Sequence, residues 1–95
     1  MIRHTVAFKL KHQSGSIEEA AFLDAAKALS AIPNVEKFEC LKEIGKKNNF
    51  DFGLSMEFSD MDTYDAYSNH PSHVNFVEDI WIPQVVEYIE IDYQL

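Results

Sequence analysis

The chain has 95 residues, of which 46% are hydrophobic and 25% charged, and its formal net charge is −8. This length suits one domain spanning residues 1–95, and the composition excludes a disordered chain. Because sixteen acidic residues face only eight basic ones, long-range repulsion argues against nucleic acid and anionic membranes as partners.

The chain opens with a predicted strand and a predicted helix. Residues 2–10 alternate between apolar and polar side chains, which is typical of a strand with one buried face, and His4 lies on the apolar face. Ser16 and Glu19 have the spacing of a capping box at the start of a helix. Apolar residues then recur at helical spacing until Pro33 ends the helix.

Two strands joined by a hairpin are predicted for the middle of the chain. The first spans residues 35–44 and is followed by a polar turn at residues 45–49. The second spans residues 50–58, where five apolar side chains alternate with four others and define the register. We therefore expect a long hairpin.

Two helices are predicted next. The polar residues 59–60 can cap a short helix that reaches Asn69. Pro71 suits the first turn of a second helix. If that helix runs through Ile80, the side chain of His73 faces apolar surroundings.

The predicted elements end with a strand. Pro83 separates the second helix from this strand, which spans residues 85–93. The order βαββαβ predicts an α+β, ferredoxin-like fold, with a four-stranded antiparallel sheet and helices on one face. The opposite face carries mixed and polar side chains that either line a barrel between two subunits or face water, namely Arg3, Thr5, Lys9, Asp51, Ser55 and Glu57.

The segment YDAYSNHPSHVNF, residues 64–76, is the most informative part of the chain. It resembles the signature of the stress-responsive A/B barrel (Dabb) domain family, which has the form aY..HP.H..F, through Ala66, Tyr67, His70, Pro71, His73 and Phe76. Both ends of the chain also resemble that family. The resemblance implies a dimeric α/β barrel, so the expected partner is a second copy of the chain.

A small-molecule pocket is expected between the helices and the sheet, because apolar walls with a few polar groups are typical of such sites. The polar groups are His4, Tyr67, His70 and His73. The expected apolar walls are Val6, Phe8, Phe22, Phe52, Leu54, Met56, Val77 and Trp81.

Tyr67 and His73 are the candidate catalytic residues. The chain resembles, more distantly, a plant polyketide cyclase branch of the family, and that resemblance implies an aldol closure driven by these two positions. An imidazole can remove a proton next to a carbonyl, and a phenol can donate to the enolate oxygen. No cofactor is expected, so the substrate needs a second activating carbonyl. Phe52 and Ala25 stand where that branch has polar residues.

Other interpretations of the same residues stay open. His73 can be structural, with its ring bonded to a backbone carbonyl or to Tyr67. The protein is then a non-catalytic, stress-linked structural oligomer. A third alternative is a cofactor-free or haem-degrading monooxygenase of the dimeric barrel type. A metal site at His70 and His73 is not expected, because Pro71 interrupts the helix between them and no third ligand is suitably spaced.

The cellular location is predicted from what the sequence lacks. No run approaches the roughly 20 apolar residues of a membrane helix, and residues 1–11 form a strand pattern without a hydrophobic signal region. Cys40 is the only cysteine, which excludes an internal disulfide and a cysteine-based zinc cluster. We expect a cytoplasmic protein that binds itself and a small molecule, with no nucleic acid or membrane partner.

Overall fold

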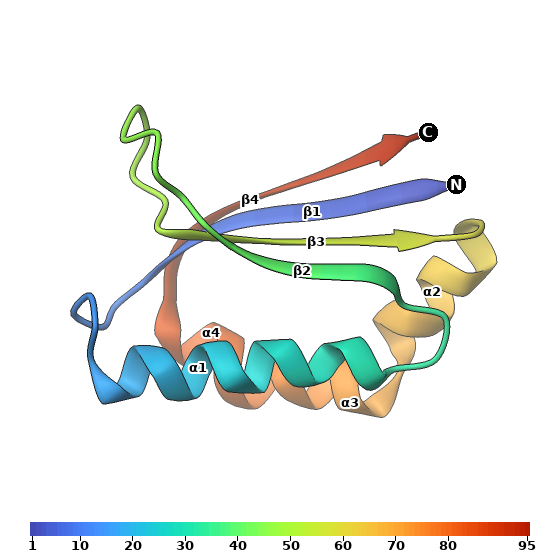
Figure 1. Cartoon of the computed structure of the whole chain (residues 1–95). Helices are drawn as coiled ribbons and strands as arrows, with labels where there is room; N and C mark the ends of the chain where they lie inside the picture. Colours follow the sequence, from blue (N-terminus) through green and yellow to red (C-terminus); the bar gives the residue numbers. More distant parts are fainter.

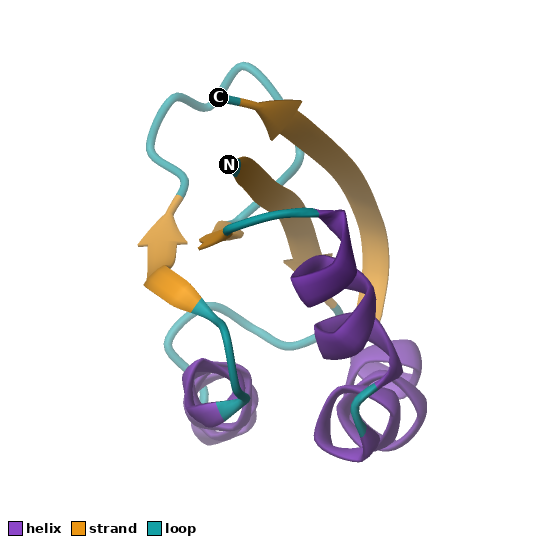
Figure 2. Cartoon of the chain, turned by 90° about the vertical axis from the view of Figure 1, so that its right-hand side faces the viewer, coloured by secondary structure: helices purple, strands orange, loops and turns teal.

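The computed structural model describes all 95 residues and confirms the predicted ferredoxin-like arrangement. An antiparallel sheet of order β2-β3-β1-β4 carries the helices on one side, in two separate columns (Figures 1 and 2). The elements are β1 (Ile2–Leu10), α1 (Ile17–Lys27), the 3-10 turn η1 (Ala28–Ala31), β2 (Glu36–Lys42), β3 (Phe52–Phe58), α2 (Met61–Asn69), α3 (Pro71–Phe76), the π-helical turn η2 (Val77–Trp81), α4 (Ile82–Gln84) and β4 (Val85–Gln94).

The register of the sheet decides which side chains face the helices. In β1 these are the even-numbered residues, and His4 lies between Met56 of β3 and Asp92 of β4. Alternating apolar residues of β1 and β3 thereby meet the apolar side of the helices. The resulting core is one cluster of buried side chains: Val6, Phe8, Leu10, Phe22, Ala26, Leu29, Ile32, Phe52, Leu54, Met56, Phe58, Tyr67 and Phe76.

Side-chain caps set where the helices begin. The Ser16 hydroxyl accepts a hydrogen bond from the Glu19 backbone N–H at 3.1 Å, and Asp60 forms a reciprocal capping box with Thr63. His70 caps α3, since its Nδ1 accepts from the Ser72 N–H at 3.1 Å. Each cap satisfies a backbone donor that the helix leaves unpaired.

The helix that follows His70 is less regular and longer than the sequence predicts. It passes from α3 into a π-helical turn at residues 77–81 and ends only at Gln84, so Pro83 lies inside the last helical turn. Proline has no N–H to donate, and the π-turn changes the hydrogen-bond pattern just before it. The prediction that Pro83 separates helix and strand was wrong, although β4 begins at Val85 as expected.

The hairpin strands are shorter than predicted. The strand predicted for residues 35–44 covers Glu36–Lys42, and the one predicted for residues 50–58 begins at Phe52. The pairing of β2 shifts register between Glu36 and Glu39, where Lys37 has a φ of 51°. This irregularity breaks the strand's alternation, and the loop at residues 43–51 is correspondingly longer.

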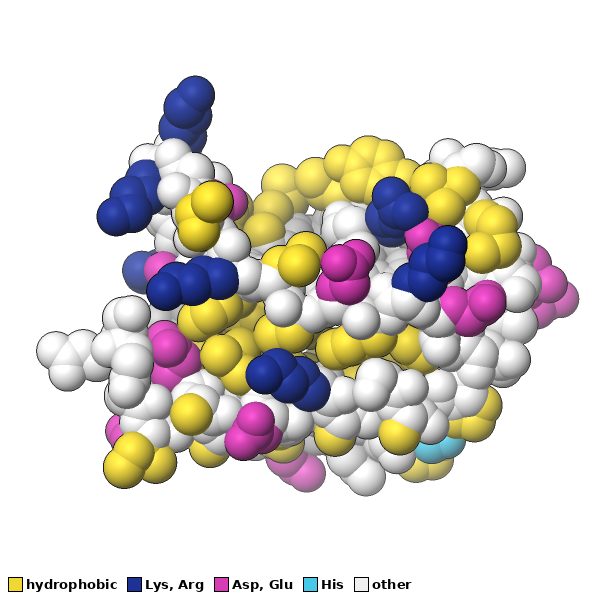
Figure 3. Space-filling model, viewed as in Figure 1, with side chains coloured by type: hydrophobic (Ala, Val, Ile, Leu, Met, Phe, Trp, Pro, Cys, Tyr) yellow, Lys and Arg dark blue, Asp and Glu magenta, His cyan; other side chains and the backbone are white.

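The sheet face opposite the helices carries an exposed apolar strip on β4. Ile89, Ile91 and Tyr93 pair with Ala7, Thr5 and Arg3 of β1, and they are 47%, 41% and 51% exposed. Figure 3 shows hydrophobic side chains along the upper margin of the molecule, away from the helices. No helix in the structure has the length and apolar content needed to span a membrane.

An ion pair occupies the same open face. Arg3 donates to Glu57 at 2.5 Å, and the Lys37 ammonium lies 3.6 Å from the other carboxylate oxygen. Glu57 is only 3% exposed, and the hydrogen bond from Arg3 lowers the pKa of its carboxyl group. The open face is therefore apolar along β4 and charged across β1 and β3.

Candidate functional site

A cavity of about 530 Å³ lies between the sheet and the helical segment from α2 to α4. That volume is within the range of small-molecule sites, roughly 300–1,000 Å³. Its lining is mostly apolar and contains no lysine or arginine. The lining residues are His4, Val6, Leu29, Leu54, Met56, Tyr67, His73, Phe76, Val77, Trp81, Ile82, Val85, Tyr88 and Glu90.

The cavity brings together most of the residues singled out from the sequence. Both candidate catalytic residues, Tyr67 and His73, line it. Of the predicted binding residues, those that also line it are His4, Val6, Leu54, Val77 and Trp81, together with the predicted wall residue Met56.

Four residues predicted for the pocket lie outside its lining. Phe8 and Phe22 are almost fully buried, and their rings pack at 5.5 Å between centroids. Phe52 packs on Phe8 at 5.9 Å. These rings fill the core beyond the cavity, and His70 caps α3 instead of entering it. Facing the helices is therefore not the same as facing the cavity, which explains the error.

His73 reaches the cavity from the first turns of α3. Its Nδ1 lies 2.9 Å from the backbone carbonyl oxygen of Ser68. A carbonyl only accepts, so Nδ1 carries the proton and the lone pair of the neutral ring is on Nε2. Partial burial lowers the pKa of His73, an effect that the Ser68 bond partly opposes and the nearby His4 reinforces. The ring is thus a neutral base near neutral pH.

Tyr67 presents a hydroxyl that no group of the protein satisfies. The residue is only 2% exposed, and its hydroxyl makes no hydrogen bond within the chain. Every fully buried side-chain nitrogen or oxygen does have a partner, so this hydroxyl must reach the open space of the cavity that Tyr67 lines. Burial raises the pKa of Tyr67, which keeps the group protonated as a donor.

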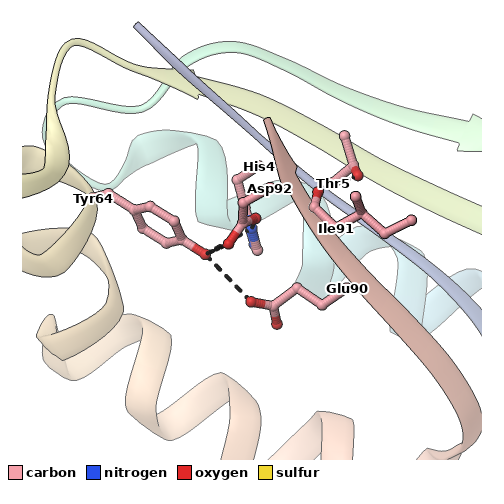
Figure 4. A network of polar contacts seen from close by, with 6 residues as sticks. All are labelled: His4, Thr5, Tyr64, Glu90, Ile91 and Asp92. Atoms are coloured by element: carbon pink, nitrogen blue, oxygen red, sulfur yellow. Dashed lines mark hydrogen bonds and ion pairs between the residues drawn. The ribbon is translucent and has the colours of Figure 1, made fainter. Parts of the chain in front are cut away.

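A second polar group lies at the end of the cavity formed by β1 and β4. The Nδ1 of His4 is 2.6 Å from Asp92 Oδ1 and 2.9 Å from the Tyr64 hydroxyl. Tyr64 donates to Asp92 Oδ2 at 2.8 Å and lies 3.3 Å from Glu90 Oε1. Figure 4 shows these side chains converging on one side of β1 and β4, whereas Thr5 and Ile91 point to the other side.

The possible metal ligands that lie close together in the structure are not the two histidines considered in the sequence. His4, Glu90 and Asp92 offer ligand atoms within 4.8 Å of one another. These atoms already hydrogen-bond to each other or to Tyr64. The two histidines considered as metal ligands in the sequence each bond to the backbone: His70 Nδ1 accepts from the Ser72 N–H, and His73 Nδ1 donates to the Ser68 carbonyl.

Sequence reasoning did not assign Tyr64, Glu90 and Asp92 to the site. The signal was present in the last strand, where acidic residues alternate with Ile89 and Ile91. An alternating strand usually turns its apolar side to the core. Here the register turns the isoleucines outward and the carboxylates toward the helices.

The βαββαβ order with helices on one side of a four-stranded antiparallel sheet defines a ferredoxin-like α+β protein. The model of the stress responsive A/B barrel domain (Dabb) matches residues 2–95, and the chain belongs to this family. No curated protein matches the chain in sequence.

Solved structures share this fold. A Dabb family protein with a ferredoxin-like fold from Mesorhizobium loti is 54% identical, with a TM-score of 0.96, over 99% of this chain and 95% of that one. A dimeric ferredoxin-like protein of unknown function from Thermobifida fusca is 23% identical, with a TM-score of 0.82, over 99% and 90%. A hydroxynitrile lyase from Passiflora edulis is 15% identical, with a TM-score of 0.86, over 99% and 92%.

Proposed function

We propose that this protein binds a small, partly apolar carbonyl compound in the cavity and removes a proton from the carbon next to its carbonyl group. His73 Nε2 is the base, and the Tyr67 hydroxyl donates a hydrogen bond to the enolate oxygen that forms. The observation that carries the proposal is the Tyr67 hydroxyl, which is held at the cavity without a protein partner beside a neutral imidazole.

The placement of this hydroxyl supports a binding role. It is open to the cavity and makes no hydrogen bond within the chain, so it can donate to a ligand oxygen there. The Tyr67 ring would fill the same space as a phenylalanine, so the hydroxyl adds nothing to packing. A ligand oxygen that accepts from this hydroxyl restores the missing hydrogen bond, and an enolate oxygen does so most strongly because it is charged.

The lining also narrows the substrate class. A neutral imidazole is a weak base, so the substrate needs an acidic carbon, such as the one between the two carbonyl groups of a β-diketone. Glu90 lines the cavity, and the only other side chains there that can carry a charge of the opposite sign are the two histidines, His4 and His73. A carboxylate on the ligand would meet this negative charge, so the substrate is neutral. The apolar walls suit its hydrocarbon part.

Deuterium exchange tests the base directly. Benzoylacetone, a neutral β-diketone, is incubated with the protein in heavy water, and loss of its central C–H signal is followed by NMR. We expect exchange above the rate in buffer, and a fall of about 100-fold in the catalysed rate for His73→Asn. Asparagine keeps a donor where Nδ1 meets the Ser68 carbonyl and removes Nε2.

A histidine outside the cavity provides the matched control. His12 bonds the Gln84 side chain at 2.7 Å and does not line the cavity. His12→Asn should therefore exchange benzoylacetone at the wild-type rate. If wild type exchanges no faster than buffer, or His73→Asn exchanges as fast as wild type, the proposal is wrong.

We also propose that the open face of the sheet pairs with a second copy of the chain. Ile89, Ile91 and Tyr93 form an apolar strip on a strand that no helix covers. Two such faces placed together would remove this apolar surface from water. The Thermobifida fusca protein of the same fold is dimeric, which supports a dimer here.

A further inference from the structure

A histidine and two carboxylates converge where β1 and β4 border the cavity. The ligand atoms of His4, Glu90 and Asp92 all lie within 4.8 Å of one another, and Figure 4 shows the three side chains on the same side of the two strands. Glu90 and Asp92 are two positions apart on β4, so they share one face of that strand. Asp92 pairs with His4 in the register. The sheet therefore sets the positions of all three side chains.

No basic side chain other than His4 balances the negative charge of the two carboxylates. Neither carboxylate forms an ion pair with a lysine or an arginine, and Asp92 pairs only with His4. No lysine or arginine lines the cavity. Burial, and after it the contacts with Asp92 and Glu90, raise the pKa of the Tyr64 hydroxyl, so this phenol stays protonated and adds no charge of its own. Two negative charges therefore face one histidine.

The hydrogen bonds of this cluster leave Glu90 without a donor. The Tyr64 oxygen lies 2.8 Å from Asp92 Oδ2 and 3.3 Å from Glu90 Oε1. A phenol has one hydrogen to donate, and the shorter contact assigns that hydrogen to Asp92. The Glu90 side chain makes no other hydrogen bond within the chain. Its carboxylate is therefore open to a further, positively charged partner.

His4 can supply a nitrogen ligand to such a partner. The residue is 8% exposed, and its Nδ1 lies 2.6 Å from Asp92 Oδ1. Its Nε2 makes no hydrogen bond within the chain, and since every fully buried side-chain nitrogen has a partner, Nε2 reaches the cavity that His4 lines. The ring can therefore carry its hydrogen on Nε2 and offer the lone pair of Nδ1 to a cation.

We propose that His4, Glu90 and Asp92 bind a divalent cation of the first transition row, such as Zn²⁺. Imidazole nitrogen and carboxylate oxygen are both ligands of such ions, whereas Mg²⁺ and Ca²⁺ prefer oxygen alone. Three protein ligands leave a coordination position open, as in zinc sites that hold an exchangeable water or ligand. Because His4 and Glu90 line the cavity, the open position adjoins the space where a small molecule would bind.

Small side-chain movements complete this site. Zinc bonds to nitrogen or oxygen are about 2.0–2.2 Å long, so the ligand atoms around one ion lie roughly 3–4 Å apart. The 2.6 Å contact between His4 and Asp92 lengthens slightly when a cation replaces the hydrogen that they share. Glu90 and Asp92 are exposed, so their carboxylates are free to adjust and the cation has an entry path from solvent.

The cation site is separate from the base of the proposed function. His73 and Tyr67 act as base and donor without a cation, so the deuterium exchange of benzoylacetone is measured in EDTA, which also prevents the diketone itself from binding divalent ions. Without the cation Glu90 keeps its negative charge, as the preference for a neutral substrate requires. Either proposal can therefore fail while the other stands.

Calorimetric titration with ZnCl2 tests the site on protein that has been treated with EDTA and then dialysed. We expect one Zn²⁺ per chain, bound at least about 10-fold more tightly than Mg²⁺. Asp92→Asn and Glu90→Gln should each weaken Zn²⁺ binding at least about 10-fold. Both positions are exposed, and circular dichroism melting verifies that the variants are folded.

Two matched substitutions control for binding elsewhere. His12 bonds the Gln84 side chain away from the cluster, and Glu87 of β4 lies opposite Lys9. His12→Asn and Glu87→Gln should bind Zn²⁺ as the wild type does. Nitrogen NMR of the histidine side chains identifies the ligand atom, because Zn²⁺ should shift the Nδ1 resonance of His4 and leave those of His12 unchanged.

The outcomes separate a site at this cluster from binding elsewhere. A wild type that binds no Zn²⁺ stoichiometrically overturns the proposal, and so does wild-type affinity in both Asp92→Asn and Glu90→Gln. A loss of affinity in His12→Asn as large as that in Asp92→Asn would place the ion at another histidine. Equal affinities for Zn²⁺ and Mg²⁺, or an unshifted Nδ1 resonance, would exclude His4 as a ligand.

Discussion

The rings of Tyr67 and His73 lie 4.6 Å apart between centroids and are inclined by 46°. They belong to different helices, because Asn69 ends α2 and Pro71 begins α3. The extended backbone at His70, with φ −64° and ψ 136°, changes the direction of the chain between the two helices, and the phenol and the imidazole meet at this turn. Tyr67 and His73 are only six positions apart in the sequence, so their contact depends on local structure.

Loss of the hydroxyl group should destabilise the protein at Tyr64 but not at Tyr67, the two tyrosines of α2. Tyr67 has an unpartnered hydroxyl, so Tyr67→Phe should change the free energy of unfolding by less than about 0.5 kcal/mol. Tyr64 donates to Asp92 and contacts His4, so Tyr64→Phe should cost about 1 kcal/mol, or roughly 4–8 °C in Tm for a domain of this size. Thermal melts measure both.

The same two variants should separate stability from binding. Tyr67→Phe should weaken catalysed exchange of benzoylacetone although the fold is intact, because the enolate oxygen loses its donor. If Tyr67→Phe instead destabilises the protein as much as Tyr64→Phe does, the Tyr67 hydroxyl has an internal partner and the argument for a ligand there is wrong.

His73 should make the protein less stable in mild acid. Burial lowers the pKa of His73 in the folded state, so the unfolded chain, with a pKa of about 6.5, binds the proton more tightly. Stability is therefore complete above that unfolded value and is lost as pH falls from it toward the folded pKa. Urea unfolding at several pH values between 7.5 and 5 is the measurement, with the wild type and His73→Asn compared.

The comparison isolates one ring. His12 and His70 are present in both proteins, so their contributions cancel in the difference, and the effect of His4 on the pKa of His73 is part of the shift being tested. The pKa of Glu57 is lowered by Arg3 from a usual value of 4.5, so its titration lies below this pH window. We expect the wild type to lose more stability than His73→Asn on acidification; equal losses would show that the folded ring binds protons as readily as the unfolded one.

The local signals in the sequence predicted most of the fold. Alternation placed His4 on the buried side of β1, and caps at Ser16 and at residue 59 or 60 were predicted from side-chain type and position alone; the structure has them at Ser16 and Asp60. These features depend on neighbours within a few residues. The strand irregularity at Lys37 and the helical path through Pro83 were missed because tertiary contacts override local preferences there.

The candidate site was only partly predictable for a different reason. His4 and Asp92 are 88 residues apart in sequence, and their contact depends on the register between β1 and β4. The isoleucines of β4 face outward in that register, so the apolar side of this strand did not point to its carboxylates as site residues. Nor does an apolar pattern distinguish side chains that fill space from those that border a cavity, which is why Phe8 and Phe52 were placed in the pocket.

Charge should decide which β-dicarbonyl compounds bind. Glu90 lines the cavity, so benzoylacetone should bind more tightly than benzoylacetate, which carries a carboxylate in place of a methyl ketone group. Isothermal titration calorimetry measures both affinities. Glu90→Gln removes the negative charge at similar size, so the affinity for benzoylacetate should rise more than that for benzoylacetone and the difference between them should shrink. Because salt screens the repulsion, the substitution should change the two affinities less at high salt. An unchanged preference in Glu90→Gln would show that this carboxylate does not face the ligand.

The apolar strip on β4 should control the oligomeric state. Ile91 is 41% exposed in the single chain, so lysine is tolerated at this position in a monomer. In a symmetric dimer each interface would contain the new ammonium twice, without a partner, and the dimer dissociation constant should rise at least about 10-fold. Size-exclusion chromatography with light scattering over a concentration series measures the change for Ile91→Lys.

The control replaces an isoleucine that is exposed on the helix side of the molecule. Ile17 begins α1 and is 84% exposed, so Ile17→Lys changes net charge equally without touching the open sheet face. We expect the wild type and Ile17→Lys to be dimers and Ile91→Lys to be a folded monomer. A wild type that is monomeric at all concentrations would show that the chain does not dimerise. An Ile91→Lys dimer as tight as the wild type would place the contact between subunits elsewhere, because an unpaired lysine cannot be buried in an apolar interface at no cost.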